Sequence, residues 1–156
     1  MRSLSQVYIL QKFCKIQKSA KIEKKLSIIM EKKMSNEEYD KNNIFAKILR
    51  GEIPCKKIDE CEHTLSFLDI NPVAKKHVLV IPKKSYINMD DFSVNASSDE
   101  QVAFLKALSR VAKLVGVNES GYRLITNIGS DGNQEVMHMH MHILGGERLG
   151  HMRPLK

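Results

Sequence analysis

Hydrophobic positions follow a helical period in two places along the chain. Residues 44–50 come directly after an Asn pair that can cap a helix, and Gly51 is a typical helix end. The pattern therefore predicts a short helix with Ile44, Phe45 and Ile48 on its buried side.

A second, longer helix is predicted to begin near residue 98. Ser98 and Gln101 have the spacing of a capping box, and Gly116 follows the last apolar position as a stop signal. The polar segment before this helix, residues 88–97, is expected to be a loop. The apolar positions of the helix are Val102, Leu105, Leu108, Ala112 and Val115.

Apolar runs of strand length occupy most of the remaining sequence. Turn-forming residues join the last two runs, and every link between neighbouring runs except the long helix is short enough for a hairpin. This order predicts an α+β fold, an antiparallel sheet of about five strands with a short N-terminal helix and a longer central helix on one face. The expected strands are 56–59, 64–70, 77–81, 122–128 and 136–144.

Charge divides the chain into two parts. Of 156 residues, 25 are Lys or Arg and 18 are Asp or Glu, which gives a net charge of +7. Residues 1–34 hold nine basic and two acidic residues, whereas residues 35–156 are balanced. We therefore expect a basic leader followed by one domain. A balanced domain gives no reason to expect a nucleic-acid partner, and no apolar run approaches the length of a membrane span.

The leader is open to three interpretations. It could be a poorly ordered extension, with the working protein beginning at Met30 or Met34. Its basic residues and near-helical apolar spacing are also typical of an organelle presequence, or of an amphipathic helix that binds a partner or a membrane surface. The three cysteines form no C-x-x-C pair and indicate a reducing compartment. We expect a cytoplasmic protein, with organelle targeting as the alternative.

The most informative segment is Met137–Leu144, in which His and apolar residues alternate. Side chains of a strand point alternately to its two faces. His138, His140 and His142 are therefore expected on one face, about 6.5–7 Å apart. Met137, Met139, Met141 and Ile143 are expected on the other face, beneath the long helix.

A row of imidazoles can serve general acid–base chemistry, metal binding or nucleophilic attack. Three histidines in one straight row cannot all reach a single metal ion without distortion, because the outer two lie about 13 Å apart. Spacing alone leaves open a metal site, solvated surface histidines and chemistry on phosphate.

The alternating segment resembles the signature of the histidine-triad superfamily of nucleotide hydrolases and transferases, and in particular its nucleotide-binding, phosphoramidase branch. Similar blocks occur in the same order over residues 42–147, among them the segments 51–54, 67–72, 77–83 and 122–127. The resemblance implies a HIT-like fold, a symmetric homodimer, and neither a metal nor a cofactor.

The resemblance also implies roles for the histidines. His140, the central one, would attack the α-phosphorus and form a nucleotidyl-histidine. His138 and His142 would donate hydrogen bonds to phosphate oxygens or to the leaving group. His77 matches an additional upstream histidine of the family.

Nucleotide-binding positions can be carried over in the same way. Asp69 matches the residue that binds the ribose hydroxyls, and the positions matching those that contact phosphate and orient the triad are Asn127, Asn133, Gln134 and Glu135. The apolar residues expected around the base are Ile44, Phe45, Ile53, Phe67 and Ile70. Glu135 stands where many relatives have Ser, and Asn133 where Gly is usual, so the preference for a leaving group stays open.

The function implied by this resemblance is hydrolysis of nucleoside 5′-phosphoramidates, which releases a purine mononucleotide and an amine. Two alternatives remain: a dinucleoside polyphosphate hydrolase, and a purine-nucleotide-binding regulatory module with incidental turnover.

Overall fold

The computed structural model describes Lys24 and residues 38–151. Contacts within the chain group it into two units, Met1–Glu38 and Tyr39–Lys156, and only the second is considered below. The leader expected over residues 1–34 lies outside the described residues apart from Lys24. In the part of the chain that the structure describes, no helix is both long and apolar enough to cross a membrane.

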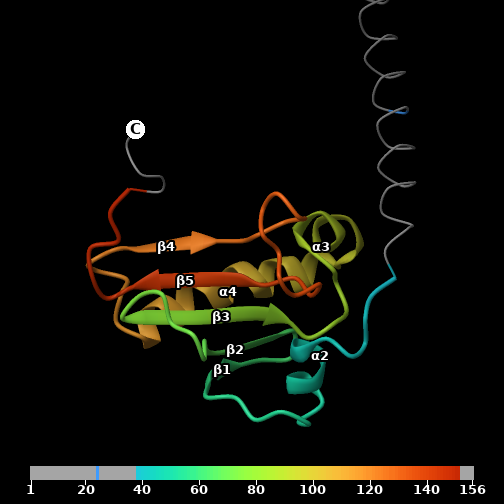
Figure 1. Cartoon of the computed structure of the whole chain (residues 1–156), viewed down its shortest axis with the longest axis horizontal. Helices are drawn as coiled ribbons and strands as arrows, with labels where there is room; N and C mark the ends of the chain where they lie inside the picture. Colours follow the sequence, from blue (N-terminus) through green and yellow to red (C-terminus); the bar gives the residue numbers. More distant parts are fainter. Residues whose placement is uncertain (1–23, 25–37, 152–156) are drawn as a thin grey trace, which may run out of the picture. The chain divides into compact units, whose positions relative to one another are not determined.

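The domain is built on one antiparallel sheet of five strands, which confirms the expected fold (Figure 1). The strands lie in the order β1-β2-β3-β5-β4, so the last strand of the chain is inserted between β3 and β4. Each strand pairs antiparallel with its neighbours. Their bounds are Lys57–Glu60 for β1, Thr64–Leu68 for β2, Lys76–Pro82 for β3, Tyr122–Ile125 for β4 and Met141–Gly145 for β5.

Two helices agree with the sequence pattern and one was not expected. Helix α2 covers Ile44–Leu49 with Asn43 as its cap, and α4 covers Ser98–Leu114. The segment predicted to be a loop contains a third helix, α3, over Met89–Asn95. Only one residue of α3 is buried, Phe92, so its sequence lacks an apolar stripe that would have indicated a helix.

Details of α4 differ from the prediction by one position. The capping box is formed by Ser97 and Glu100, one residue before the predicted pair. Leu108 and Ala112 are buried as expected, but Val102 and Leu105 are exposed. The residues that complete the buried side of α4 are Glu100, Phe104, Ala107 and Val111. The apolar stripe is thus rotated around the helix from the one that was predicted.

The sheet is covered on both faces, because alternate residues of β3 enter two different hydrophobic clusters. Val78 and Val80 pack in the cluster that α4 and α3 cover. Leu79 and Ile81 pack on the opposite face, in a cluster that includes Phe45 of α2. The expectation that both predicted helices share one face is therefore wrong. His77 has the same parity as Leu79 and so belongs to the α2 face.

The histidine segment is only partly a strand. Strand β5 begins at Met141, whereas the predicted strand began at residue 136. The residues before it are held by other contacts: the Met139 amide donates to the Tyr86 carbonyl at 2.6 Å, and the Thr126 hydroxyl donates to the His140 carbonyl at 2.9 Å. Met139 is buried beneath α4 as expected, but Met137 is exposed.

Candidate active site

A cavity of about 730 Å³ opens on the α2 face of the sheet. It is lined by α2, the end of β2 and the turn after it, β3, β5 and the connection between β4 and β5. Most of the residues expected to form a nucleotide site line this cavity. They are Ile44, Phe45, Ile53, Phe67, Asp69, Ile70, His77, Asn127, Asn133, Glu135, His140 and His142. Two of the expected residues, Gln134 and His138, do not line it.

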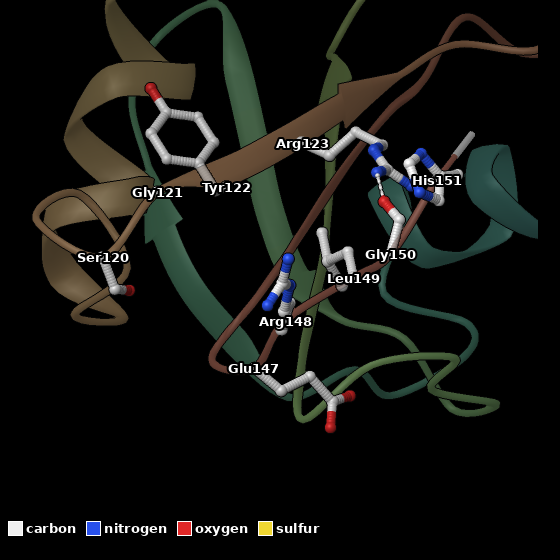
Figure 2. Close-up of a pocket in the computed structure, with 9 residues that line it drawn as sticks. All are labelled: Ser120, Gly121, Tyr122, Arg123, Glu147, Arg148, Leu149, Gly150 and His151. Carbon is white, nitrogen blue, oxygen red and sulfur yellow. Dashed lines mark hydrogen bonds between the residues drawn. The ribbon is translucent and has the colours of Figure 1, made fainter.

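A second cavity, of about 470 Å³, lies beside β4 and the segment that follows β5 (Figure 2). Arg123 donates a hydrogen bond to the Gly150 carbonyl across it, at 2.8 Å. None of the residues expected to act on phosphate lines this cavity. Most of the residues expected to act on phosphate belong to the first cavity.

One ring nitrogen of His140 is hydrogen-bonded to the backbone, and the other has no hydrogen-bond partner among the described residues. Its Nδ1 lies 2.7 Å from the His138 carbonyl oxygen, which can only accept, so Nδ1 carries the proton. The other nitrogen, Nε2, then holds a lone pair. Burial lowers the pKa of His140, which keeps the ring neutral at physiological pH. A neutral imidazole in a cavity, with an available lone pair, can attack an electrophile.

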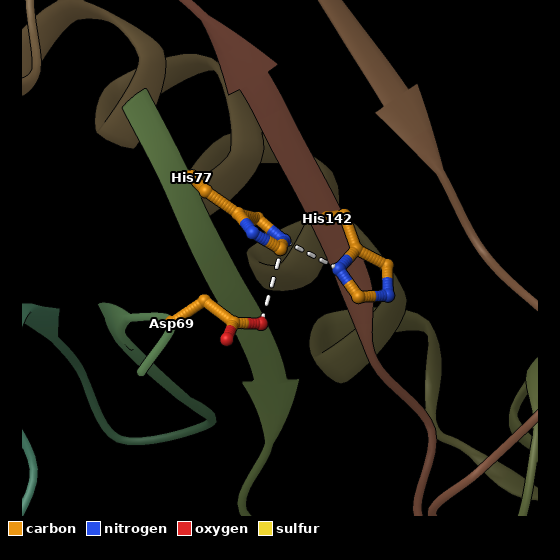
Figure 3. A group of neighbouring side chains, drawn as sticks. All are labelled: Asp69, His77 and His142. Atoms are coloured by element: carbon orange, nitrogen blue, oxygen red, sulfur yellow. Dashed lines mark hydrogen bonds and ion pairs between the residues drawn. The ribbon is translucent and has the colours of Figure 1, made fainter. Parts of the chain in front are cut away.

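The tautomer of His142 follows from a chain of hydrogen bonds that begins at a backbone amide. Val73 N–H donates to Nδ1 of His77 at 3.3 Å, which leaves the proton of His77 on Nε2. That Nε2–H lies 2.8 Å from Nδ1 of His142 (Figure 3), and 3.4 Å from Oδ2 of Asp69. Because Nδ1 of His142 accepts, Nε2 of His142 carries a proton and is available as a donor.

Burial keeps both rings of this chain neutral. Burial lowers the pKa of His77, although the Asp69 carboxylate opposes the shift. Burial, together with the neighbouring His140 and His77, lowers the pKa of His142 to about 4. The ring centroids of His140 and His142 are 5.1 Å apart. A lone pair and an N–H donor thus lie side by side in the cavity.

His138 lies on the expected face of the sheet, with its ring centroid 6.1 Å from that of Phe45, but it does not line the cavity. Its ring is fully buried and both nitrogens are engaged: Nε2 donates to the Pro82 carbonyl at 2.9 Å, and Nδ1 accepts from the Tyr39 hydroxyl at 2.5 Å. Burial lowers its pKa to about 4. His138 therefore offers no donor to the cavity, in contrast to the role that the family resemblance implied. It acts on the site through its carbonyl, which orients His140.

The HIT domain family profile matches residues 50–149, about two thirds of the chain. The chain belongs to the HIT family. It is 55% identical over 114 residues to an uncharacterised HIT-like protein of Azospirillum brasilense, an alignment that covers 73% of this chain and 93% of that protein. A HIT-like protein of Helicobacter pylori is 50% identical over 107 residues, covering 68% of this chain and 98% of the relative.

Solved structures of other HIT proteins have the same fold. A HIT family hydrolase from Clostridium thermocellum is 38% identical, with a TM-score of 0.68, and the match covers 74% of this chain and 99% of that one. A HIT family hydrolase from Legionella pneumophila is 40% identical, with a TM-score of 0.64 and coverage of 69% and 95%. A hypothetical histidine triad nucleotide-binding protein from Sulfolobus tokodaii is 31% identical, with a TM-score of 0.55 and coverage of 65% and 66%.

In this HIT protein the turn before the triad is built around Gln134, which is buried outside the cavity. Its Nε2 donates to the carbonyls of Ile87 and Val136, at 2.7 and 3.1 Å, and its Oε1 accepts from the Gly129 amide at 3.1 Å. The side chain thus ties the turn to the segment before α3. Gln134 positions the turn rather than contacting a ligand in the cavity.

The neighbours of Gln134 do reach the cavity. Asn133 has a left-handed backbone, with φ of 55°, and its carbonyl accepts from the Asn127 amide at 3.2 Å. Glycine adopts this conformation with least strain, and Asn is the residue that replaces it most readily. Asn133 therefore preserves the turn although it differs from the usual Gly. Glu135, which follows, is exposed at the cavity wall.

Three atoms in the HIT site could approach one metal ion. Single ligand atoms of Asp69, His77 and His142 all lie within 4.8 Å of one another. A metal on Nε2 of His77 would move the ring proton to Nδ1, where it would face the Val73 N–H. The hydrogen bonds therefore fit a donor chain better than a metal site.

Some residues of the site gave no recognisable signal in the sequence. Tyr39 lies upstream of every matched block, and its contact with His138 spans 99 residues. Cys55, Val73 and Leu144 line the cavity but read as ordinary apolar or turn positions. Whether such a residue lines the cavity depends on the face of the sheet that it occupies, and the residue type alone does not reveal that face.

Proposed function

We propose that this HIT protein hydrolyses nucleoside 5′-phosphoramidates and releases a purine mononucleotide and a free amine. The observation that supports this most directly is the state of His140, whose Nδ1–H is held by a carbonyl while Nε2 keeps its lone pair in the cavity. The description of two similar structures as hydrolases, and of a third as nucleotide-binding, agrees with this proposal.

In the first step, Nε2 of His140 attacks the α-phosphorus in line with the P–N bond. The P–N bond breaks and its electron pair stays on the amine nitrogen, which takes up one proton. The bound phosphate anion raises the proton affinity of the hydrogen-bonded pair His77 and His142, so that the pair can take up a proton from solvent while His142 passes on its own proton from Nε2. The His138 carbonyl stabilises the positive charge that forms on the His140 ring.

In the second step, water replaces His140 on phosphorus. The water oxygen forms the new P–O bond, the bond between phosphorus and Nε2 breaks, and its electron pair returns to His140. His142, neutral after the first step, accepts the proton of the water. The products are a nucleoside 5′-monophosphate and, once His142 has released this proton to solvent, the original enzyme.

The nucleoside would occupy the side of the cavity formed by α2 and β2. The Asp69 side chain is 16% exposed, and its Oδ1 already accepts from the Asn71 amide at 2.7 Å. Its remaining lone pairs can accept from the two ribose hydroxyls. The apolar side chains Phe45 and Phe67 form a wall against which a purine can pack.

We also propose that the protein is a homodimer. Strand β4 is an edge of the sheet, and its side chains Tyr122 and Leu124 are exposed. Two residues on the exposed side of α4, Val102 and Leu105, add further apolar surface. An open edge with exposed apolar residues is a suitable surface for a second copy.

The test is turnover of an adenosine 5′-phosphoramidate by the wild-type protein, by His140→Ala and by a control, His63→Gln, whose histidine lies outside the cavity. His140→Ala should lose at least about 1,000-fold in turnover while still binding AMP. Quenched wild-type protein should carry one nucleotidyl group on His140, detectable by mass spectrometry.

Other outcomes would support the alternatives. Retained turnover in His140→Ala would contradict the assigned nucleophile. Faster cleavage of dinucleoside polyphosphates than of any phosphoramidate would favour a dinucleoside polyphosphate hydrolase. Binding of AMP without turnover of either substrate class would favour a regulatory module.

A further inference from the structure

The phosphate end of the cavity has an unusual charge composition for a site that handles nucleotides. Among the described residues that line it, none is Lys or Arg, and two are carboxylates, Asp69 and Glu135. The three histidines in the cavity are neutral near pH 7, because their pKa values are lowered. The fixed charges of the cavity are therefore negative.

A polyanionic leaving group fits such a site poorly. Proteins that transfer phosphoryl groups of polyphosphates hold them with Lys, Arg or magnesium. Here the available donors are neutral N–H groups, which suit a single phosphate with one negative charge. The second carboxylate would repel any further negative charge placed beyond the phosphorus.

Glu135 is held in place by its chain neighbours but has no ionic partner. The buried amide of Gln134 fixes the backbone on one side, and the only side-chain contact of Glu135 within the described residues is a weak one, to Nδ2 of Asn133 at 3.4 Å. Its carboxylate forms no ion pair with any described residue. An exposed carboxylate on a fixed turn is free to pair with a charge on a ligand.

Glu135 comes from a different part of the cavity wall than the residues proposed to bind the nucleoside. Asp69 and the apolar wall come from α2, β2 and the turn after it, whereas Glu135 belongs to the β4–β5 connection, together with Asn127 and Asn133. Glu135 and His140 line the same cavity. In an in-line displacement the leaving group lies beyond the phosphorus, away from the attacking Nε2. A carboxylate near His140 but apart from the nucleoside can meet that group.

We propose that Glu135 is a specificity-determining residue that selects leaving groups carrying a positive charge. The favoured substrates are nucleoside phosphoramidates of amines with a second, protonated amino group, and the disfavoured ones carry an anionic leaving group. This inference rests on the proposed phosphoramidase activity and names the substrate class within it.

The experiment compares three adenosine 5′-phosphoramidates of similar size, made from ethylenediamine, propylamine and glycine. At pH 7.5 their leaving groups carry a positive charge, no charge and a negative charge beyond the reacting nitrogen. The measured quantity is kcat/KM for each substrate in wild type, in Glu135→Gln and in Glu135→Lys. The matched control is Asp131→Asn, which removes a carboxylate from the same turn but outside the cavity lining.

The expected result is a change in the ratio of kcat/KM between substrates. The ratio of kcat/KM for the cationic over the anionic substrate should fall about two- to fivefold in Glu135→Gln, as for removal of one exposed ion pair. It should fall further in Glu135→Lys and stay at the wild-type value in Asp131→Asn. Differences in the intrinsic reactivity of the three substrates cancel, because each ratio is compared with the same ratio in wild type. In wild type the ratio should also fall as salt rises.

The outcomes separate the two proposals. Turnover of all three substrates with the same ratio in wild type and in Glu135→Gln would overturn the role of Glu135 and leave the phosphoramidase activity standing. Turnover of none of them by wild type would overturn both. Should Glu135→Gln lose all activity, the wild-type salt series decides: a ratio that does not change between low and high salt would overturn the role of Glu135.

Discussion

The carbonyl oxygen of His138 accepts a hydrogen bond from Nδ1 of His140 at 2.7 Å. This single contact determines which nitrogen of His140 can act, because the protonated Nδ1 leaves the lone pair on Nε2. It also gives His138 a role that needs no contact with substrate. Tyr39 and Pro82 hold the ring of His138 in place, and the His138 carbonyl in turn orients His140.

Tyr39→Phe tests whether His138 must be held from both sides. The substitution removes the hydroxyl that donates to Nδ1 of His138 and leaves a buried acceptor without a partner. We expect a loss of about 1–2 kcal/mol in the free energy of unfolding, measured by urea denaturation, and a lower kcat with little change in KM.

The control for Tyr39→Phe is Ser85→Ala, which removes an exposed hydroxyl outside the cavity lining. It should leave both stability and kcat close to the wild-type values. An equally stable and active Tyr39→Phe protein would show that His138 keeps its position without the hydroxyl.

Much of the fold could be predicted from the sequence because the relevant signals are local. The alternation in β3 and the cap before α2 each lie within a few residues and do not depend on distant contacts. Helix α3 could not be found in this way, since Phe92 is its one buried residue. The rotation of α4 was also missed, because exposed Val102 and Leu105 looked like part of the buried stripe.

In the candidate site, too, the local features could be predicted and those that depend on distant contacts could not. The pattern of alternating histidines correctly brings His140 and His142 into one cavity. It also places His138 on the same face, beside Phe45, but it does not show that this ring is enclosed away from the cavity, because the chain leaves the strand before Met141 and contacts from Thr126 and Tyr86 replace the ladder. The partners of that irregular segment are far apart in sequence, so a periodic pattern cannot reveal them.

His77 variants test the hydrogen-bond chain that sets the tautomer of His142. His77→Ala removes the N–H that donates to Nδ1 of His142, so that His142 can place its proton on either nitrogen. We expect kcat to fall about 10- to 100-fold, the usual cost of losing such a supporting contact, with a smaller change in KM.

His77→Gln is the matched variant, because its amide N–H₂ can donate from a position near that of Nε2. It should recover a substantial part of the kcat lost in His77→Ala. A purely structural role for His77 predicts instead that both variants lose activity in proportion to their loss of stability, which urea denaturation measures in parallel.

Removal of metal ions tests whether Asp69, His77 and His142 form a metal site instead of a hydrogen-bond chain. The existing hydrogen bonds already use Nε2 of His77 as a donor, so the reaction as proposed needs no ion there. Turnover after exhaustive chelation and dialysis should equal that of the untreated protein, and added zinc should inhibit by competing for the same atoms. A loss of turnover on chelation that zinc restores would contradict this prediction.

The buried histidines also predict how stability depends on pH. The pKa of His138 is about 4 in the folded protein and near 6.5 when the chain unfolds, so the unfolded state binds more protons between these values. Stability is therefore complete above about pH 6.5 and declines as pH falls toward 4. For His138 alone the loss is about 3 kcal/mol, and His142 changes in the same direction.

Urea denaturation between pH 7.5 and 4.5 measures this decline. The Glu100 carboxylate has a pKa of about 2, so its contribution changes only below its ordinary value of 4.5 and does not add to the slope. His138→Gln, which keeps an amide donor for the Pro82 carbonyl, should flatten the curve, whereas the control His63→Gln should not. A wild-type protein that is equally stable at pH 7.5 and 4.5 would contradict the neutral, buried state of His138.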